Sequence, residues 1–274
     1  MNAHFKHYLI TRYNVPLEGW HIDKSGLTTR DKAWLSHRHS LFTQYCIPTI
    51  LAQSEQNFIW LIYCDKDTPE EQLNEINNSI ISIPQAQIQL STGYHDCMEN
   101  IDKILAESGT PYVITSRLDN DDGIGKDYIK TIQEHFVPLD GAIINLLHGH
   151  GYNPLSKVAT RLYNMHLNHF TSLIEKTRTN RGHITIRGFQ HDNPPPNFQI
   201  IDLPVKNGWL KIFHERNLKS SLFGYPKFMI RLNRRYGIDK KYSEINFYHT
   251  FIYGLWWLGD GIKRKLLRIP SPQK

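Results

Sequence analysis

The sequence has few cysteines and no long apolar run. Its three cysteines, Cys46, Cys64 and Cys97, lie in apolar or helical patterns without metal-ligand spacing. They cannot all pair, so we expect reduced, buried thiols in a cytoplasmic protein. No stretch is apolar enough for a clear membrane span, and the N-terminus lacks the apolar region of a secretion signal. A Gly-x-x-x-x-Gly-Lys-Ser/Thr phosphate-binding loop is missing, and residues 149–151 are too short for a dinucleotide fingerprint.

The composition is that of a globular enzyme with a basic surface. The chain has 274 residues, of which 40% are hydrophobic and 12% aromatic. This length suffices for a sizeable core in one large domain or two small ones. The net charge of +6 favours anionic partners such as nucleotides, phosphorylated lipids, nucleic acid or a membrane surface.

Apolar segments alternate with helical patterns in the first half of the chain. The expected strands are residues 7–13, 58–65, 87–91, 112–118 and 141–147. The expected helices are residues 39–53, 96–107 and 126–136, with another beginning near residues 68–71. Pro48 should kink or interrupt the first of these helices. Such alternation predicts an α/β fold with a mostly parallel, doubly wound sheet.

The second half of the chain is less regular. Residues 185–187 and 209–214 are expected to be strands, and the region after Phe223 is basic, aromatic and helical in pattern. No linker marks a clean boundary. We therefore expect a catalytic domain over residues 1–220 and a helical C-terminal appendage over residues 221–274.

The most informative segment joins a strand to an acidic cluster. The apolar run 112–115 leads into Asp119, Asp121 and Asp122. Asp119 and Asp121 are two residues apart, so on an extended chain their side chains point the same way. A strand that ends in carboxylates delivers them to the edge of an α/β sheet where ligands bind. Carboxylates suit Mg²⁺ or Mn²⁺ on a diphosphate, although Asp, Asn and Gly are also common in turns.

This pattern resembles the putative rhamnosyltransferase family, which has a glycosyltransferase-A type fold. The likeness covers about the first 217 residues. The matching segments are residues 8–14, 34–38, 41–42, 45–50, 58–65, 115–122, 170–175 and 209–214, with Gln53, His191 and Asn217. The acidic motif in its strand context is the most specific of them.

The resemblance implies a metal-dependent transferase that uses a nucleotide-diphosphate sugar. It implies Mn²⁺ or Mg²⁺ as the cofactor, with Asp121 as a direct ligand and His214 as a further ligand. Asp119 would reach the ribose or the metal, and Asp122 would bind hydroxyl groups of the donor sugar. His214 could equally be one of the packed or surface histidines, of which the chain has 15 in all.

Other polar residues at the ends of strands are candidates for donor binding. Arg12, Arg38 and Arg117 can clamp phosphates, because guanidinium groups pair with them in a fork. Asp65 suits a hydrogen bond to a base or ribose, and Trp209 is assigned to the same substrate-binding set. A structural salt bridge is the alternative role for the arginines, and helix capping is the alternative for Asp65.

An inverting transferase needs a carboxylate that deprotonates the acceptor hydroxyl. We expect Glu175 in this role, because it lies in a family-like segment, with Asp192 beside His191 as the second candidate. Either could instead be a surface carboxylate. A retaining mechanism needs no such base, and the pattern does not decide between the two.

The acceptor is expected to be a glycan or a lipid-linked molecule. The C-terminal region combines ten cationic residues with aromatic ones, which suits peripheral binding at the inner face of an anionic membrane or, alternatively, packing on the catalytic domain. The ten are Lys227, Arg231, Arg234, Arg235, Lys240, Lys241, Lys263, Arg264, Lys265 and Arg268. Metal-dependent nucleotidyl or phosphoryl transfer is the competing activity. A nucleic-acid-binding module is less favoured, because the basic residues do not follow one motif.

Overall fold

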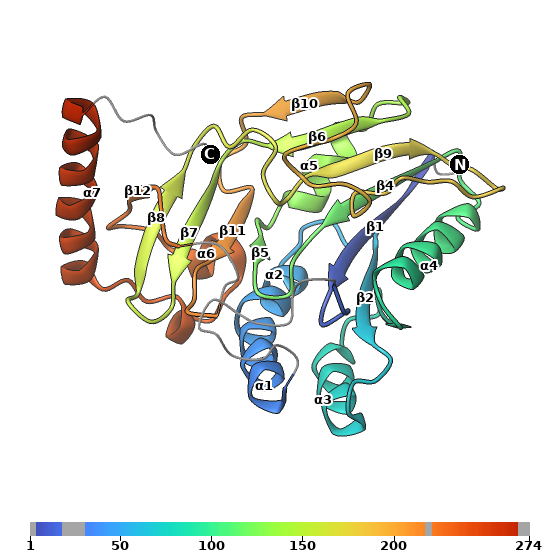
Figure 1. Ribbon diagram of the computed structural model, residues 1–274, viewed down its shortest axis with the longest axis horizontal. Coiled ribbons are helices and arrows are strands. Elements are labelled where there is room, and N and C mark those ends of the chain that lie inside the picture. The colour runs from blue at the N-terminus through green and yellow to red at the C-terminus, as the bar shows by residue number, and fades with distance from the viewer. Residues whose placement is uncertain (1–3, 18–30, 217–220, 268–274) are drawn as a thin grey trace.

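Two β-sheets form the centre of the molecule (Figure 1). The computed structural model describes residues 4–17, 31–216 and 221–267. Within these residues one sheet has seven strands and the other has five. Cys46, Cys64 and Cys97 are all buried and form no disulfide with one another, as the sequence predicts.

The larger sheet is mostly parallel, which confirms the predicted architecture. Its strand order is β10 (Gln199–Leu203), β6 (Ala142–Leu146), β9 (Ser172–Lys176), β4 (Tyr112–Arg117), β1 (Phe5–Arg12), β2 (Ile59–Asp65) and β3 (Ala86–Ser91). Only β9 runs antiparallel to its neighbours β4 and β6. All of the five strands predicted for the first half of the chain belong to this sheet.

Helices cover both faces of the larger sheet. Alternate residues of β1 point to opposite faces, so Leu9 packs in one cluster while Tyr8 and Ile10 pack in another. The Leu9 cluster includes buried residues of α1 (Lys32–Leu41), α3 (Glu70–Ile80) and α5 (Tyr128–Glu134). The opposite cluster includes those of α4 (Tyr94–Ala106).

Pro48 interrupts its helix, as expected. A π-helical segment, η1 (Phe42–Cys46), separates α1 from α2 (Ile47–Leu51), and Pro48 lies in the first turn of α2. Proline has no N–H to donate and its ring clashes with the preceding turn. The wider π turn accommodates this break in the α-helical ladder.

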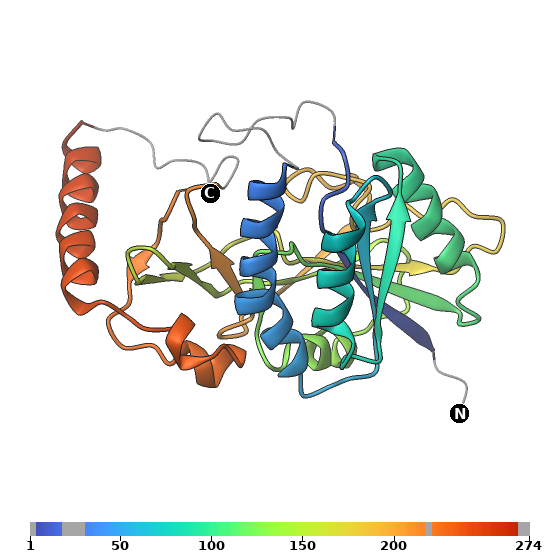
Figure 2. The same cartoon turned by 90° about the horizontal axis from the view of Figure 1, so that it is seen from below.

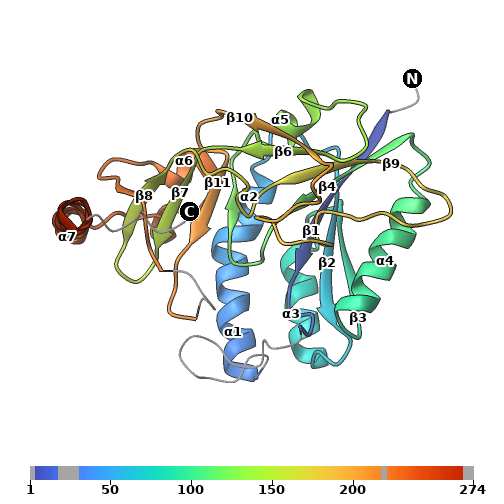
Figure 3. The same cartoon turned by 45° about the horizontal axis from the view of Figure 1, so that its top comes forward.

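The smaller sheet was not expected from the sequence. Its order is β12 (Tyr225–Pro226), β8 (Val158–Leu162), β7 (Gly149–Asn153), β11 (Trp209–Ile212) and β5 (Gly123–Ile124). Figure 3 shows it beside the larger sheet. Of its strands only β11 was predicted. The strand predicted over residues 185–187 is wrong, because this segment is a loop without strand pairing.

The region after residue 220 belongs in part to the main body. It contains β12, α6 (Leu232–Tyr236), a 3₁₀ turn η2 (Lys240–Tyr242) and α7 (Phe247–Leu267). Leu232 and Tyr236 are buried in one cluster with Leu210 and Ile212 of β11. A boundary at residue 220 therefore does not separate two packed units, and only α7 projects at the edge of the molecule (Figure 2).

Candidate functional site

Polar side chains gather where strands of the larger sheet end. The parallel strands β1, β2 and β4 end in Arg12, Asp65 and Arg117 at one edge, and the acidic segment 119–122 directly follows β4. This is the carboxyl edge, where open α/β sheets bind their ligands.

The smaller sheet holds the acidic segment in place. β5 follows Asp122 in the chain and pairs with β11, with Gly123 opposite Leu210. Asp122 consequently accepts hydrogen bonds from Lys211 Nζ at 2.7 Å and from the Ile212 N–H at 2.9 Å. Burial raises the pKa of Asp122 to about 7. Burial would lower the pKa of Lys211, but Asp122 and the other two aspartates raise it.

Asp121 lies between an arginine and a histidine. Its Oδ2 atom is 2.6 Å from Arg38 Nη1 and 3.0 Å from His214 Nε2. His214 Nδ1 is in turn 3.3 Å from His37 Nε2. Burial opposes ionisation of Asp121, but the Arg38 charge and the His214 contact hold its pKa below the ordinary value. Asp121 is thus a buried, ionised carboxylate at the sheet edge.

Asp119 faces guanidinium groups. Its Oδ1 atom accepts a hydrogen bond from Arg187 Nη1 at 2.9 Å and lies 3.9 Å from Arg117 Nε. Burial opposes the ionisation of Asp119, but Arg187 and Arg117 hold its pKa well below the ordinary value. Arg12 lies near Asp119 and Arg117, and its pKa is lowered by burial and by the Arg117 charge.

Arg187 and Lys211 were missed by the sequence reasoning. Arg187 donates through Nη2 to the Ile10 and Leu118 carbonyls, at 2.8 Å each, and so joins the ends of β1 and β4. Burial lowers the pKa of Arg187 to about 9. Both residues lay inside predicted strands, where nothing marked them as partners of carboxylates distant in the sequence. For Lys211, its place in the family-like segment 209–214 was the one available signal.

The site carries more cations than carboxylates. Counted over the described residues, five cationic side chains surround the three aspartates: Arg12, Arg38, Arg117, Arg187 and Lys211. The Nε donors of Arg38, Arg117 and Arg187 are buried and have no hydrogen-bond partner among these residues. The excess of positive charge around the acidic segment suits an anionic ligand.

Two of the three predicted metal ligands lie side by side. Asp121 and His214 present adjacent oxygen and nitrogen atoms, whereas Asp119 pairs with Arg187. In the part of the chain that the structure describes, no group of three or more His, Cys, Asp or Glu side chains could hold a metal ion. Mg²⁺ commonly takes one or two carboxylates and completes its shell with water and substrate phosphates.

Three predicted substrate-binding residues have other surroundings. Asp122 is fully buried against Lys211 and β11, so it does not face a donor sugar. Trp209 is buried, stacks on Phe170 and donates its indole N–H to the Leu146 carbonyl, so it is a core residue. Arg38 forms the salt bridge with Asp121, the alternative that the sequence left open for the arginines.

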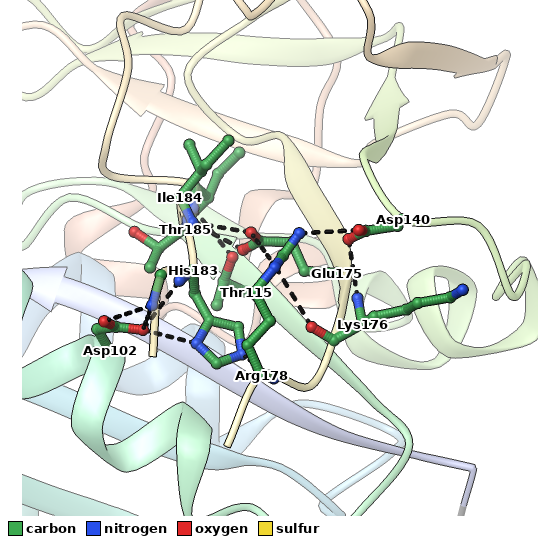
Figure 4. A network of polar contacts seen from close by, with 11 residues as sticks. Asp102, Thr115, Asp140, Glu175, Lys176, Arg178, His183, Ile184 and Thr185 are labelled. Atoms are coloured by element: carbon green, nitrogen blue, oxygen red, sulfur yellow. Dashed lines mark hydrogen bonds and ion pairs between the residues drawn. The ribbon is translucent and has the colours of Figure 1, made fainter. Parts of the chain in front are cut away.

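Glu175 does not lie at this edge. Strand β9 runs antiparallel to β4 and places Glu175 opposite Val113, four residues before Arg117 and so about 13 Å along the strand. Figure 4 shows its carboxylate directed at the backbone of the following loop. It accepts hydrogen bonds from the Ile184 and Thr185 N–H groups at 2.8 and 2.9 Å. This geometry speaks against Glu175 as the catalytic base.

Glu175 belongs to a polar network that fixes the loop carrying Arg187. Asp102 of α4 accepts from His183 Nδ1 at 2.6 Å, and Arg178 Nη2 contacts Asp140 at 2.8 Å. Thr185 has φ of +61°, which is strained for a β-branched residue. The two hydrogen bonds to Glu175 hold this backbone, and Arg187 follows two residues later.

Replacing Glu175 with glutamine is expected to destabilise the fold and to spare turnover. A glutamine amide can accept one of the two backbone N–H groups and turns a donor toward the other. We expect a loss of about 1–3 kcal/mol, or a fall in Tm of about 2–4 °C per kcal/mol. Calorimetry compares the Tm of Glu175→Gln with that of the wild type, and kinetics at one temperature well below both Tm values compare their turnover. Lost turnover with an unchanged Tm would restore Glu175 as the base.

The remaining predicted base, Asp192, is exposed and adjoins a histidine pair. The rings of His191 and His169 lie 3.8 Å apart. Burial and the Arg117 charge lower the pKa of His191 to about 4, and burial and Lys211 lower that of His169 to about 2. Both imidazoles are therefore neutral near pH 7 and lie close to the cationic site.

Asp65 ends β2 at the same edge. Its Oδ1 atom accepts from the Asp67 N–H at 3.1 Å, as expected for a residue that caps a turn. Contact with a base or ribose remains a prediction for this residue.

Fold and site together define a mixed α/β protein with a carboxylate and guanidinium site at the carboxyl edge of its central sheet. The chain belongs to the putative rhamnosyl transferase family, which it matches over residues 6–224. It is therefore a member of a glycosyltransferase family, as the sequence resemblance indicated. Comparison with curated proteins finds no match.

Among solved structures the chain is similar to S. aureus TarS 1–349. The identity is 13% to that structure alone, 15% to its complex with UDP and 13% to its complex with UDP-GlcNAc. The similarity covers 76%, 76% and 80% of this chain, with TM-scores of 0.40, 0.43 and 0.44. The chain spans 60–62% of the length of those structures.

Proposed function

We propose that this protein transfers a sugar from a nucleotide-diphosphate donor to a glycan or lipid-linked acceptor. The observation that carries the proposal is the excess of cationic side chains over aspartates around segment 119–122. A diphosphate supplies the missing negative charge. Rhamnose is the donor sugar suggested by the family description.

Each group at the edge has a distinct task in this proposal. Arg12 and Arg117 bind the diphosphate, because guanidinium groups donate two parallel hydrogen bonds to phosphate oxygens. Arg187 fixes Asp119 beside them. Asp121 and His214 would hold Mn²⁺ or Mg²⁺, which offsets negative charge on the departing diphosphate. Lys211 neutralises Asp122 behind the motif.

The reaction is a displacement at the anomeric carbon. The acceptor oxygen forms a bond to this carbon as the bond to the diphosphate oxygen breaks, and the nucleoside diphosphate leaves. In the inverting form that we propose, the acceptor proton passes to a carboxylate, for which Asp192 is the remaining candidate. The buried guanidinium groups stabilise the leaving group without reorganising, which is the electrostatic form of catalysis.

Nucleoside diphosphates are expected to stabilise the protein against heat. At a concentration of one hundred times Kd, a ligand that binds only the folded state adds about 2.7 kcal/mol, or roughly 5–10 °C in Tm at 2–4 °C per kcal/mol. UDP, GDP and dTDP are compared with and without Mn²⁺. A single-stranded oligonucleotide serves as the control anion. If phosphate charge alone stabilised the protein, the oligonucleotide and the nucleoside diphosphates would both raise the Tm.

A donor screen then separates the candidate activities. Nucleotide-sugars are incubated with protein and Mn²⁺, and release of nucleoside diphosphate is measured. Release of nucleoside monophosphate or pyrophosphate instead would indicate nucleotidyl or phosphoryl transfer. A larger thermal shift with the oligonucleotide than with any nucleoside diphosphate would contradict the proposed donor site.

A further inference from the structure

Helix α7 exposes apolar side chains on its outer side. Its inner side is formed by the buried Thr250 and Gly254 and the half-buried Trp257, whose ring lies 4.8 Å from that of Tyr225 on β12. The outer residues are between 48% and 68% exposed and are Phe247, Tyr248, Phe251, Leu255, Trp256 and Leu258. Apolar residues on both sides of a surface helix indicate that the outer side is covered in use.

This apolar surface continues into a groove bordered by arginines. The ring of Phe247 lies 5.1 Å from that of Phe228, which lines a groove of about 680 Å³ with Met229. Met229 is 86% exposed. Three arginines, Arg231, Arg234 and Arg235, line the same groove and are exposed. The outer side of α7 and this groove together are called the α7 surface below.

We propose that the α7 surface docks on an anionic lipid membrane, with α7 lying in the interface. Tryptophan and tyrosine favour the level of lipid headgroups, and arginines at the border attract anionic ones. Among the described helices, none is long and apolar enough to cross a membrane. An amphipathic helix with aromatic residues and adjacent positive charge is typical of peripheral binding instead.

Charge favours lipid over a second copy of the chain. In a two-fold dimer the same surface faces itself, so the arginines of the groove would approach those of the other copy. Like charges across an interface oppose association, whereas anionic headgroups complement them. The sequence continues past the described side chains with Lys263, Arg264 and Lys265, which adds positive charge to the same region of the chain.

Vesicle co-sedimentation tests the docking. Vesicles of phosphatidylcholine with 30% phosphatidylglycerol are compared with pure phosphatidylcholine, at low and at high salt. We expect at least about tenfold stronger binding to the anionic vesicles and weakening by salt, because exposed charges are screened over about 8 Å at physiological ionic strength. Equal binding to both vesicles, or no binding, would overturn the proposal.

Matched variants locate the surface. Phe251→Ser with Trp256→Ser removes apolar contacts, and Arg231→Glu with Arg234→Glu reverses charge. Each pair should lower the vesicle affinity at least tenfold. Ile81→Ser, at a residue that is 77% exposed directly after α3, is the control and should bind as the wild type does. Unchanged binding by both pairs contradicts the assignment.

Two further measurements keep the result unambiguous. Circular dichroism melting shows whether each variant is folded, and the positions chosen are exposed. Sedimentation velocity on the wild type and on the Phe251→Ser, Trp256→Ser pair tests self-association. A wild-type dimer that the pair dissociates would make this surface an interface between copies and overturn the membrane assignment. Nucleotide affinity should be unchanged in all variants, so this outcome is independent of the proposed transferase site.

Discussion

Replacing Asp121 with asparagine is expected to lower kcat/KM by about 100-fold or more, the effect of removing one preorganised charge-stabilising group. Asparagine keeps the shape and an oxygen that can accept from Arg38, but it removes the negative charge next to His214. The effect of Mn²⁺ on nucleotide affinity should disappear as well, because a neutral amide is a weaker metal ligand than a carboxylate.

Titration calorimetry with a nucleoside diphosphate, with and without Mn²⁺, separates the two parts of this prediction. Persistence of the Mn²⁺ effect would contradict the metal assignment alone. Turnover near the wild-type value would contradict the placement of the whole site. Glu134→Gln is the control, since Glu134 is an exposed carboxylate in a surface pair with Lys130.

The fold is also expected to lose stability in Asp121→Asn. Arg38 and Asp121 are both nearly buried, and a hydrogen bond to a charged group contributes about 1.5–3 kcal/mol. Activity must therefore be measured well below the Tm of the variant. The sequence alone suggested a carboxylate that acts on ligands only, and the buried pair with Arg38 changes that expectation.

A truncation of the whole region after residue 222 is not a useful test of membrane binding. Removing the chain from Phe223 onward should destroy the fold, because Leu232 and Tyr236 would be lost from the core around β11. A truncation after Asn246 removes α7 and residues 268–274 and is the useful variant for membrane binding.

Strand ends were predictable because they depend on local patterns. The apolar run before Asp119 and the run before Asp65 identify parallel strands, and parallel strands bring their carboxyl ends to one edge. This reasoning placed Arg12, Asp65 and Arg117 correctly at the edge. It also placed the acidic motif there.

Pairings across the sheets were not predictable in this way. The contact of Lys211 with Asp122 depends on β5 pairing with β11, and β5 has only two residues. Glu175 was favoured because of its family-like segment, but β9 runs antiparallel and carries it away from the edge. The direction of a strand is set by tertiary connections that a single sequence pattern does not show.

The second large effect is expected from Arg187. Replacing it with methionine leaves Asp119 and the carbonyls of Ile10 and Leu118 without their donors. Breaking a buried ion pair by removing one partner costs about 3–5 kcal/mol. Because the same guanidinium group orients Asp119, kcat/KM should fall as well.

A double-mutant cycle shows whether Arg187 acts through Asp119. Asp119→Asn removes the charge that Arg187→Met leaves unpaired, so the double variant should be more stable than the sum of the single losses predicts. We expect a coupling free energy of about 1–3 kcal/mol, measured by urea unfolding, whereas independent sites add within about 0.5 kcal/mol. Additive losses would mean that Arg187 stabilises the strand ends through the carbonyls alone.

Arg187→Lys separates charge from geometry. A lysine keeps the positive charge near Asp119. It lacks the planar guanidinium group that donates to the Asp119 carboxylate and to the Ile10 and Leu118 carbonyls at the same time. If Arg187 positions Asp119, this variant should recover part of the stability lost in Arg187→Met while kcat/KM stays low. Recovery of both quantities would show that the positive charge of Arg187 is sufficient and that its planar geometry is not needed.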